Sequence, residues 1–257
     1  MKRPSKEIKR IARDMLNNRY RVPMILFVIA TLIPAIVRIP FSINIGESVS
    51  ITQLVISLLA EYLILLVTQV LSVGVVYVHL NMTRGWEFKI SQVLYPFKNG
   101  TDRFLGGGFL LSLLAIGCCV PFIGGMIYFS FADLTVVSSG ILIACGVVSA
   151  ILGILYSLNY NFVLYLLLDY PEMKIKDAFR EARRMMKGKK GRLFYIQCSY
   201  IGWKLLTICS LGIASLWVEP YFTQIMVTFY LDCTGELDRI PVREYGSQDS
   251  VDSYPIY

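Results

Sequence analysis

The sequence predicts an all-α fold: a polytopic helical membrane protein with about six transmembrane helices and two interfacial amphipathic helices. The mean hydropathy is +0.58, and 55% of the 257 residues are hydrophobic, against about 45–50% in soluble domains. Several apolar runs reach the roughly 20 residues that a helix needs to cross a hydrocarbon core about 30 Å thick. Lys and Arg gather between alternate runs, which is typical of cytoplasmic loops.

The distribution of Lys and Arg predicts the orientation. Residues 1–21 hold eight, 81–104 hold four and 169–192 hold nine, whereas 44–53 and 130–139 hold none. Because positive residues stay in the cytoplasm, we expect a multi-pass protein of the cell membrane with a cytoplasmic N-terminus. Six crossings return the C-terminus to the cytoplasm, and five would leave it outside.

The first expected element is an amphipathic helix over residues 5–20. Ser5 suits a helix N-terminus, and apolar and basic side chains then alternate at helical spacing. This pattern favours an interfacial helix on anionic headgroups, with a solvated basic arm as the alternative. The apolar face is Ile8, Ile11, Ala12, Met15 and Leu16, and the basic face is Lys6, Lys9, Arg10 and Arg13.

Six apolar runs are the expected spans. The first is interpreted as a retained span, because its basic flank is long and no small-residue cleavage site follows it. The spans cover about residues 22–43, 54–80, 105–129, 140–168, 193–211 and 214–231.

The last two spans come from one stretch, 193–231, which holds 39 residues. As a single helix it would be about 58 Å long at about 1.5 Å per residue, nearly twice the hydrocarbon thickness. We therefore expect a turn near Ser210–Ser215, where Gly212 permits a break. A broken or re-entrant helix is the alternative.

A second amphipathic helix is expected at residues 172–188, with Asp177 and Glu181 toward its start and basic residues crowding its end. That order suits the helix dipole. Residues 1–231 are expected to form a single membrane domain. Residues 232–257 are expected to form an acidic, disordered cytoplasmic tail.

Ionisable residues inside the spans are the first site candidates, because each costs about 2.5–3.5 kcal/mol at the centre of a membrane helix unless it is paired or faces water. They are Arg38, Glu61, Lys204 and Glu219. Similar depth predicts two buried ion pairs, Arg38 with Glu61 and Lys204 with Glu219. The pairs either line a proton or substrate path or hold helices together.

The densest basic cluster is the second candidate, as a docking site for lipid headgroups or a partner protein on the cytoplasmic face. Topology determination alone is the alternative. Because basic segments that flank spans report topology and anionic lipid, a nucleic-acid partner is not expected. The cluster is Arg183, Arg184, Lys187, Lys189 and Lys190.

Nothing in the sequence predicts catalysis, a metal or a cofactor. The six cysteines form no C-x-x-C pair, and His79 is the single histidine. Phosphate-loop, dinucleotide, zinc-protease and serine-hydrolase motifs are missing. We therefore expect a protein that is not an enzyme, with an intramembrane enzyme as a remote alternative.

Three segments resemble an uncharacterised family of bacterial membrane proteins, the domain of unknown function number 975. They are SKEIKRIARDMLNNRY, DAFREARRMMKGKKGRLF and SYIGWKLLTICSLGIASLWVEPYFTQIMVTFYLD. Arg84-Gly85 and Phe97-Lys98 also sit where this family has similar pairs. The C-terminal matches are Ile201, Gly202, Trp203, Leu211, Gly212, Ile213, Leu216, Trp217, Pro220, Tyr221, Phe229, Tyr230 and Asp232.

The resemblance implies a five- or six-pass protein, mostly from Gram-positive bacteria, and no established activity. Ala182 stands where the family has Ser, and Lys189 where it has His, which puts in doubt any role for that hydroxyl or imidazole. The leading hypothesis is a non-enzymatic membrane protein that organises lipids or partner proteins at the cytoplasmic leaflet. Expected partners are anionic lipids and a membrane protein or a second copy. A small transporter or channel, or a subunit of one, is the alternative.

Overall fold

The computed structural model describes residues 3–42, 50–131 and 135–240, and within them it contains helices and no strands. The predicted all-α class is therefore confirmed. The longer elements are α1 (Ser5–Leu16), α2 (Arg21–Ser42), α3 (Ile51–Arg84), α5 (Thr101–Phe131), α6 (Val136–Tyr160), α7 (Val163–Asp169), α8 (Ile175–Met185), α9 (Lys190–Cys209) and α10 (Ser215–Thr234). Short turns η1 (Ile90–Leu94), α4 (Tyr95–Lys98) and η2 (Glu236–Asp238) complete them.

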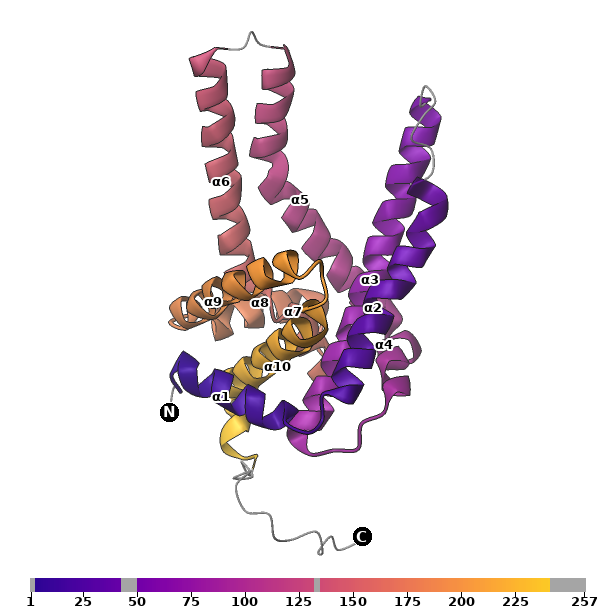
Figure 1. Ribbon diagram of the computed structural model, residues 1–257, viewed down its shortest axis with the longest axis vertical. Coiled ribbons are helices and arrows are strands. Elements are labelled where there is room, and N and C mark those ends of the chain that lie inside the picture. The colour runs from indigo at the N-terminus through magenta and orange to yellow at the C-terminus, as the bar shows by residue number, and fades with distance from the viewer. Residues whose placement is uncertain (1–2, 43–49, 132–134, 241–257) are drawn as a thin grey trace, which may run out of the picture.

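The long helices form two arms that rise from a common base (Figure 1). The first arm is α2 with α3, and the second arm is α5 with α6; the two diverge toward the top of the view. The base contains α1 and α7 to α10. Within the described ranges, four segments are long and apolar enough to cross a membrane: Arg21–Phe41, Ile51–Arg84, Thr101–Phe131 and Val136–Asp169. The chain is thus a multi-pass membrane protein by length and composition.

Helix α3 shows how the arms and the base differ. A capping box between Ser50 and Gln53 starts it, and Gly85 ends it with φ 77°. At 34 residues the helix is about 51 Å long, more than the hydrocarbon needs. Its lower turns are buried in the base, whereas its upper turns expose leucines, as a lipid-facing surface does.

The last two expected spans differ from the prediction. Neither α9 nor α10 is among the four membrane candidates, because Lys, Arg, Glu and hydroxyl residues lower their hydropathy. The break is where the sequence predicts it: α9 ends at Cys209, and Gly212 takes φ +90°. In Figure 1, α9 runs across the direction of α5 and α6 rather than beside them. Six crossings are therefore not confirmed.

The core lies in the base and includes both amphipathic helices. On α1, Ile8, Ala12 and Leu16 are fully buried, and α1 packs chiefly against α10. On α8, Ala178 and Ala182 are fully buried. The apolar faces of these helices therefore pack on the protein itself, and most of their basic side chains are exposed.

The C-terminal region is folded further than predicted. Residues 232–240 were expected in the tail, but α10 continues to Thr234 and η2 follows it. Leu237 is fully buried, and acidic side chains of this stretch form ion pairs that are described below. Residues 241–257 lie outside the described part of the chain.

Candidate functional site

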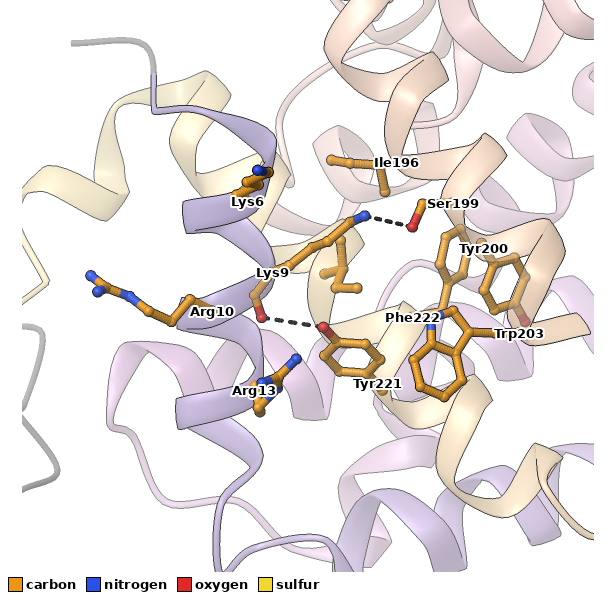
Figure 2. A pocket seen from close by; sticks show the side chains of 11 residues that line it. Lys6, Lys9, Arg10, Arg13, Ile196, Ser199, Tyr200, Trp203, Tyr221 and Phe222 are labelled. Carbon is orange, nitrogen blue, oxygen red and sulfur yellow. Dashed lines mark hydrogen bonds between the residues drawn. The ribbon is translucent and has the colours of Figure 1, made fainter. Parts of the chain in front are cut away.

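A pocket of about 330 Å³ lies at the base, between α1 on one side and α9 and α10 on the other (Figure 2). Its position follows from the packing of α1, whose buried face rests on α10 and leaves its basic face beside α9. No acidic residue of the described part of the chain lines it. The lining residues are Lys6, Lys9, Arg10, Arg13, Ile196, Ser199, Tyr200, Trp203, Tyr221, Phe222 and Ile225.

One wall of the pocket is the basic face of α1. Lys6, Lys9, Arg10 and Arg13 are three or four residues apart, so helical geometry places them on one side. In Figure 2, Lys9 and Arg13 extend toward α9 and α10, while Arg10 points away. Within the described residues, none of these four cations has a carboxylate within 4.0 Å.

Lys9 is the cation that reaches deepest. Its Nζ donates a hydrogen bond of 2.6 Å to the Ser199 hydroxyl and lies 4.9 Å from the centre of the Tyr195 ring. Burial lowers the pKa of the Lys9 ammonium below its usual 10.5. Both of these partners are neutral. The ammonium is therefore partly desolvated by burial without an anion from the described residues beside it.

The opposite wall is aromatic. The rings of Tyr200 and Phe222 stack with their centres 3.8 Å apart, which joins α9 to α10. The Tyr221 hydroxyl donates a hydrogen bond of 3.4 Å to the main-chain carbonyl of Lys9, which joins α10 to α1. Trp203 completes this wall and remains half exposed. The pocket therefore offers cations on one side and apolar rings on the other.

The predicted pair of Lys204 and Glu219 forms beside this wall. Lys204 Nζ donates a hydrogen bond to Glu219 Oε1, which ties α9 to α10 near their turn. The same ammonium lies 5.1 Å from the centre of the Tyr200 ring. The pair is only partly buried, because the Lys204 side chain is 49% exposed.

The predicted pair of Arg38 and Glu61 also forms, between α2 and α3 of the first arm. Arg38 Nε lies 3.1 Å from Glu61 Oε2, and about half of each side chain is exposed. The expected depth of Arg38 and Glu61 in their spans therefore predicts the pairing correctly. It overestimates how far the two side chains are buried. The two ion pairs do not form one site, because one joins α2 to α3 and the other joins α9 to α10.

The five-residue basic cluster is divided by the structure. Arg183, Arg184 and Lys187 are exposed, and Arg184 Nε lies 3.2 Å from Glu181. Lys189 instead donates a hydrogen bond of 2.9 Å to the carbonyl of Cys233, near the end of α10. Lys190 is partly buried. Three of the five residues therefore remain on the surface as a docking candidate.

Sequence analysis missed a cluster around Arg84, here called the Arg84 clamp (Arg84, Asp169, Tyr230 and Glu236). Arg84 Nε and Nη2 donate hydrogen bonds of 2.7 and 2.8 Å to Glu236, and its two Nη atoms donate to Asp169. The Tyr230 hydroxyl also donates to Asp169, at 2.9 Å. The Arg84-Gly85 pair, which resembles the family, was a sequence feature that pointed to this cluster. The residues that bind Arg84 could not be identified from it, because they are distant in sequence.

A second missed pair joins two of the segments that carry the family resemblance. Arg192 Nη2 donates a hydrogen bond of 2.8 Å to Asp232, whose side chain is 2% exposed. The Arg3 guanidinium lies 3.7 Å from the same carboxylate and 2.7 Å from Asp238. The segment just before α1, the beginning of α9 and the end of α10 are thereby joined at the base.

Comparison with known proteins gives one family. The family described as "Protein of unknown function (DUF975)" matches residues 1–236, which include the pocket, the Arg84 clamp and both membrane arms. No curated protein and no solved structure matches the chain. The segments that resemble the family in sequence meet at the base, where Arg192 binds Asp232. Since the match covers most of its length, the chain belongs to the DUF975 family of proteins of unknown function.

Proposed function

We propose that this chain is a non-enzymatic membrane protein that binds an anionic phospholipid of the cytoplasmic leaflet in the pocket between α1, α9 and α10. The observation that carries the proposal is the Lys9 ammonium, partly buried and held only by neutral groups. A partly buried cation has lost some of its hydration, and an anion that binds it compensates for that loss of free energy. Phosphate groups are anions of this kind at a membrane surface.

The shape of the pocket supports a lipid as the source of that phosphate. A lipid carries its phosphate next to apolar chains, and this pocket places cations next to Trp203 and Phe222. Tryptophan is enriched at the level of lipid headgroups, and Trp203 is half exposed. The basic face of α1 thus supports the predicted headgroup contact, although its apolar face packs on α10.

Lipids retained on purification test this proposal. The protein is extracted into native-lipid nanodiscs, and bound lipids are identified by mass spectrometry. We expect anionic phospholipid to be enriched over the surrounding membrane, and Lys9→Gln with Arg13→Gln to abolish that enrichment. Lys174→Gln with Lys176→Gln removes the same charge from an exposed part of the chain and is expected to leave it intact. Equal loss in both double variants would contradict the proposal.

The proposed setting is a bacterial cell membrane, that of a Gram-positive organism by the family resemblance, with the base of the molecule in the cytoplasm. The positive segments 1–21, 81–104 and 169–192 support this side for the base. Six crossings remain the sequence prediction. The direction of α9 in Figure 1 favours the alternative, a hairpin of α9 and α10 that enters from the cytoplasmic side. Four and six crossings leave both chain ends on the same side.

Cys209, at the end of α9, distinguishes these two topologies. In a variant that keeps Cys209 as its one cysteine, a membrane-impermeant maleimide is applied to intact cells. Six crossings bring the turn after Cys209 to the outer surface, so the cysteine would react. The re-entrant hairpin keeps it in the hydrocarbon, and we expect no reaction until detergent is added.

A transporter, a channel or a subunit of one is the second candidate, and the half-exposed pair of Arg38 and Glu61 favours it. A charged pair exposed on a membrane arm is costly unless water or a partner faces it. Solute flux in proteoliposomes that disappears with Glu61→Gln would support this function. The partner could also be a membrane protein or a second copy, docked on this arm or on exposed Arg183, Arg184 and Lys187.

A further inference from the structure

The charge of the pocket indicates which class of anionic lipid it would bind. This inference rests on the proposed function. Among the described residues, four cations and no acidic residue line the pocket, and none of the four has a carboxylate partner. Arg10 points away in Figure 2, whereas Lys9 and Arg13 extend toward the pocket's other walls. A phosphodiester headgroup brings a single negative charge. A terminal phosphate brings about −1.5 to −2 at pH 7 and three strong acceptor oxygens.

We propose that the ligand is a lipid whose headgroup is a terminal phosphate monoester, as in phosphatidic acid, rather than a phosphodiester. Lys9 and Arg13 lie on successive turns of α1 and both line the pocket; in Figure 2, Lys9 points to Ser199 and Arg13 lies beside Tyr221. The Ser199 hydroxyl lies 2.6 Å from Lys9 Nζ, so these two donors are close enough to bind neighbouring oxygens of one phosphate. Lys9, Arg13 and Ser199 thus offer one donor for each of the three unsubstituted oxygens of a terminal phosphate. Hydrogen bonds to an ionised acceptor are stronger than hydrogen bonds between neutral groups.

The surroundings of those donors disfavour a second headgroup alcohol. The wall opposite the cations is made of the Tyr200 and Phe222 rings, and the Tyr221 hydroxyl already donates to the carbonyl of Lys9. A glycerol or ethanolamine group beyond the phosphate would face these rings, where its polar atoms would lose water without gaining partners. The acyl side of the lipid instead suits Trp203, which is half exposed.

Trp203 supplies a direct reporter of occupancy. The chain has three tryptophans, and Trp86→Phe with Trp217→Phe leaves Trp203 as the one that fluoresces. This variant is reconstituted in phosphatidylcholine nanodiscs that contain increasing fractions of a lipid with brominated acyl chains, which quench a neighbouring indole. The brominated lipid is phosphatidic acid, phosphatidylglycerol, cardiolipin or phosphatidylcholine, each compared at equal phosphate.

We expect phosphatidic acid to reach half-maximal quenching at a fraction roughly tenfold lower than phosphatidylglycerol does, equivalent to about 1.4 kcal/mol. Adding Lys9→Gln and Arg13→Gln should remove the difference, and adding Lys174→Gln and Lys176→Gln should preserve it. Soluble glycerol 3-phosphate at millimolar concentration should not reverse the quenching, because it lacks the apolar part that Trp203 contacts.

The other outcomes separate this inference from the function on which it rests. Equal quenching by phosphatidic acid and phosphatidylglycerol, or stronger quenching by cardiolipin, would overturn the terminal phosphate and leave anionic-lipid binding standing. No preference over phosphatidylcholine would overturn both. Reversal by glycerol 3-phosphate would show that a free phosphate ester occupies the pocket and would overturn the lipid assignment.

Discussion

Arg84 and Asp169 join the lower ends of the two membrane arms. Arg84 is the last residue of α3, and Asp169 ends α7, which continues from α6. Two parallel hydrogen bonds of 2.9 Å connect Nη1 with Oδ1 and Nη2 with Oδ2. Both side chains are nearly buried, at 11% and 12% exposed. The arms also meet higher up, where the Tyr62 hydroxyl of α3 lies 2.8 Å from the Ser112 hydroxyl of α5. Arg84 and Asp169 therefore hold the lower ends of the arms together, well below the part where the arms diverge (Figure 1).

Arg84→Lys should destabilise the protein even though it keeps the charge. A lysine is a point charge and cannot bind Asp169 and Glu236 with two donors each. Breaking a buried ion pair costs about 3–5 kcal/mol, so we expect a clearly lower Tm for the purified protein in detergent. Arg180→Lys is the matched control, since that side chain is 81% exposed. Equal Tm values for the two variants would contradict the clamp.

The same reasoning distinguishes two carboxylates that share Arg3. Asp232 is almost fully buried and also binds Arg192, whereas Asp238 is half exposed and binds Arg3 alone. Asp232→Asn removes the charge that faces two guanidinium groups and leaves both in a partly buried site. We expect it to lower the Tm and Asp238→Asn to leave it nearly unchanged, as for exposed pairs. Thermal unfolding in one detergent measures both, and the reverse order would refute the assignment.

Gly74 tests the packing of α3 against η1. A Cβ at Gly74 would lie 1.8 Å from the carbonyl oxygen of Val93, and a main-chain atom cannot move aside as a flexible side chain does. Gly74→Ala should therefore reduce the yield of folded, monodisperse protein. Gly117→Ala is the control, because nothing lies within 4 Å of its new methyl group and alanine favours a helix. Size-exclusion chromatography after membrane extraction compares them; a folded Gly74→Ala protein would argue against this contact.

The sequence predicts features that depend on local pattern. Hydropathy places the four membrane helices, and the turn at Gly212 follows from the length of the apolar stretch that contains it. Depth in the membrane identifies the partners of Arg38 and Lys204. Each of these inferences needs only the spacing of residues along one helix or across one turn.

The sequence cannot predict contacts that depend on how the base is assembled. Arg84 and Glu236 are 152 residues apart, and Lys9 and Ser199 are 190 apart. Hydropathy also gives no direction to α9. The length of the apolar stretch therefore predicts six spans, although α9 runs across the direction of α5 and α6 in Figure 1. The pocket was missed for the same reason: its basic wall is visible in the sequence, but the rings that face it lie on α9 and α10.

The pH dependence of lipid binding tests the role of Lys9 most directly. Burial lowers the pKa of Lys9, so its charge is lost at a pH below 10.5 as the pH rises, while the second pKa of a phosphate monoester is about 6. Quenching of Trp203 by brominated phosphatidic acid should therefore weaken as the pH rises above neutrality, and this loss should begin at a lower pH than an ordinary lysine with a pKa of 10.5 would give. The charged or titratable groups that line the pocket with Lys9 are Lys6, Arg10 and Arg13 on α1, Tyr200 on α9 and Tyr221 on α10, and the ring of Tyr195 on α9 lies beside its ammonium.

Lys9→Arg separates Lys9 from those neighbours. An arginine stays protonated beyond pH 12, so this variant should keep its lipid over the whole range, whereas the tyrosines are the same in both proteins. If Lys9→Arg lost the lipid at the same pH as the natural chain, a tyrosine or the membrane itself would be responsible. The Lys9 ammonium would then not be the group that holds the phosphate, and the pocket would need another anchor.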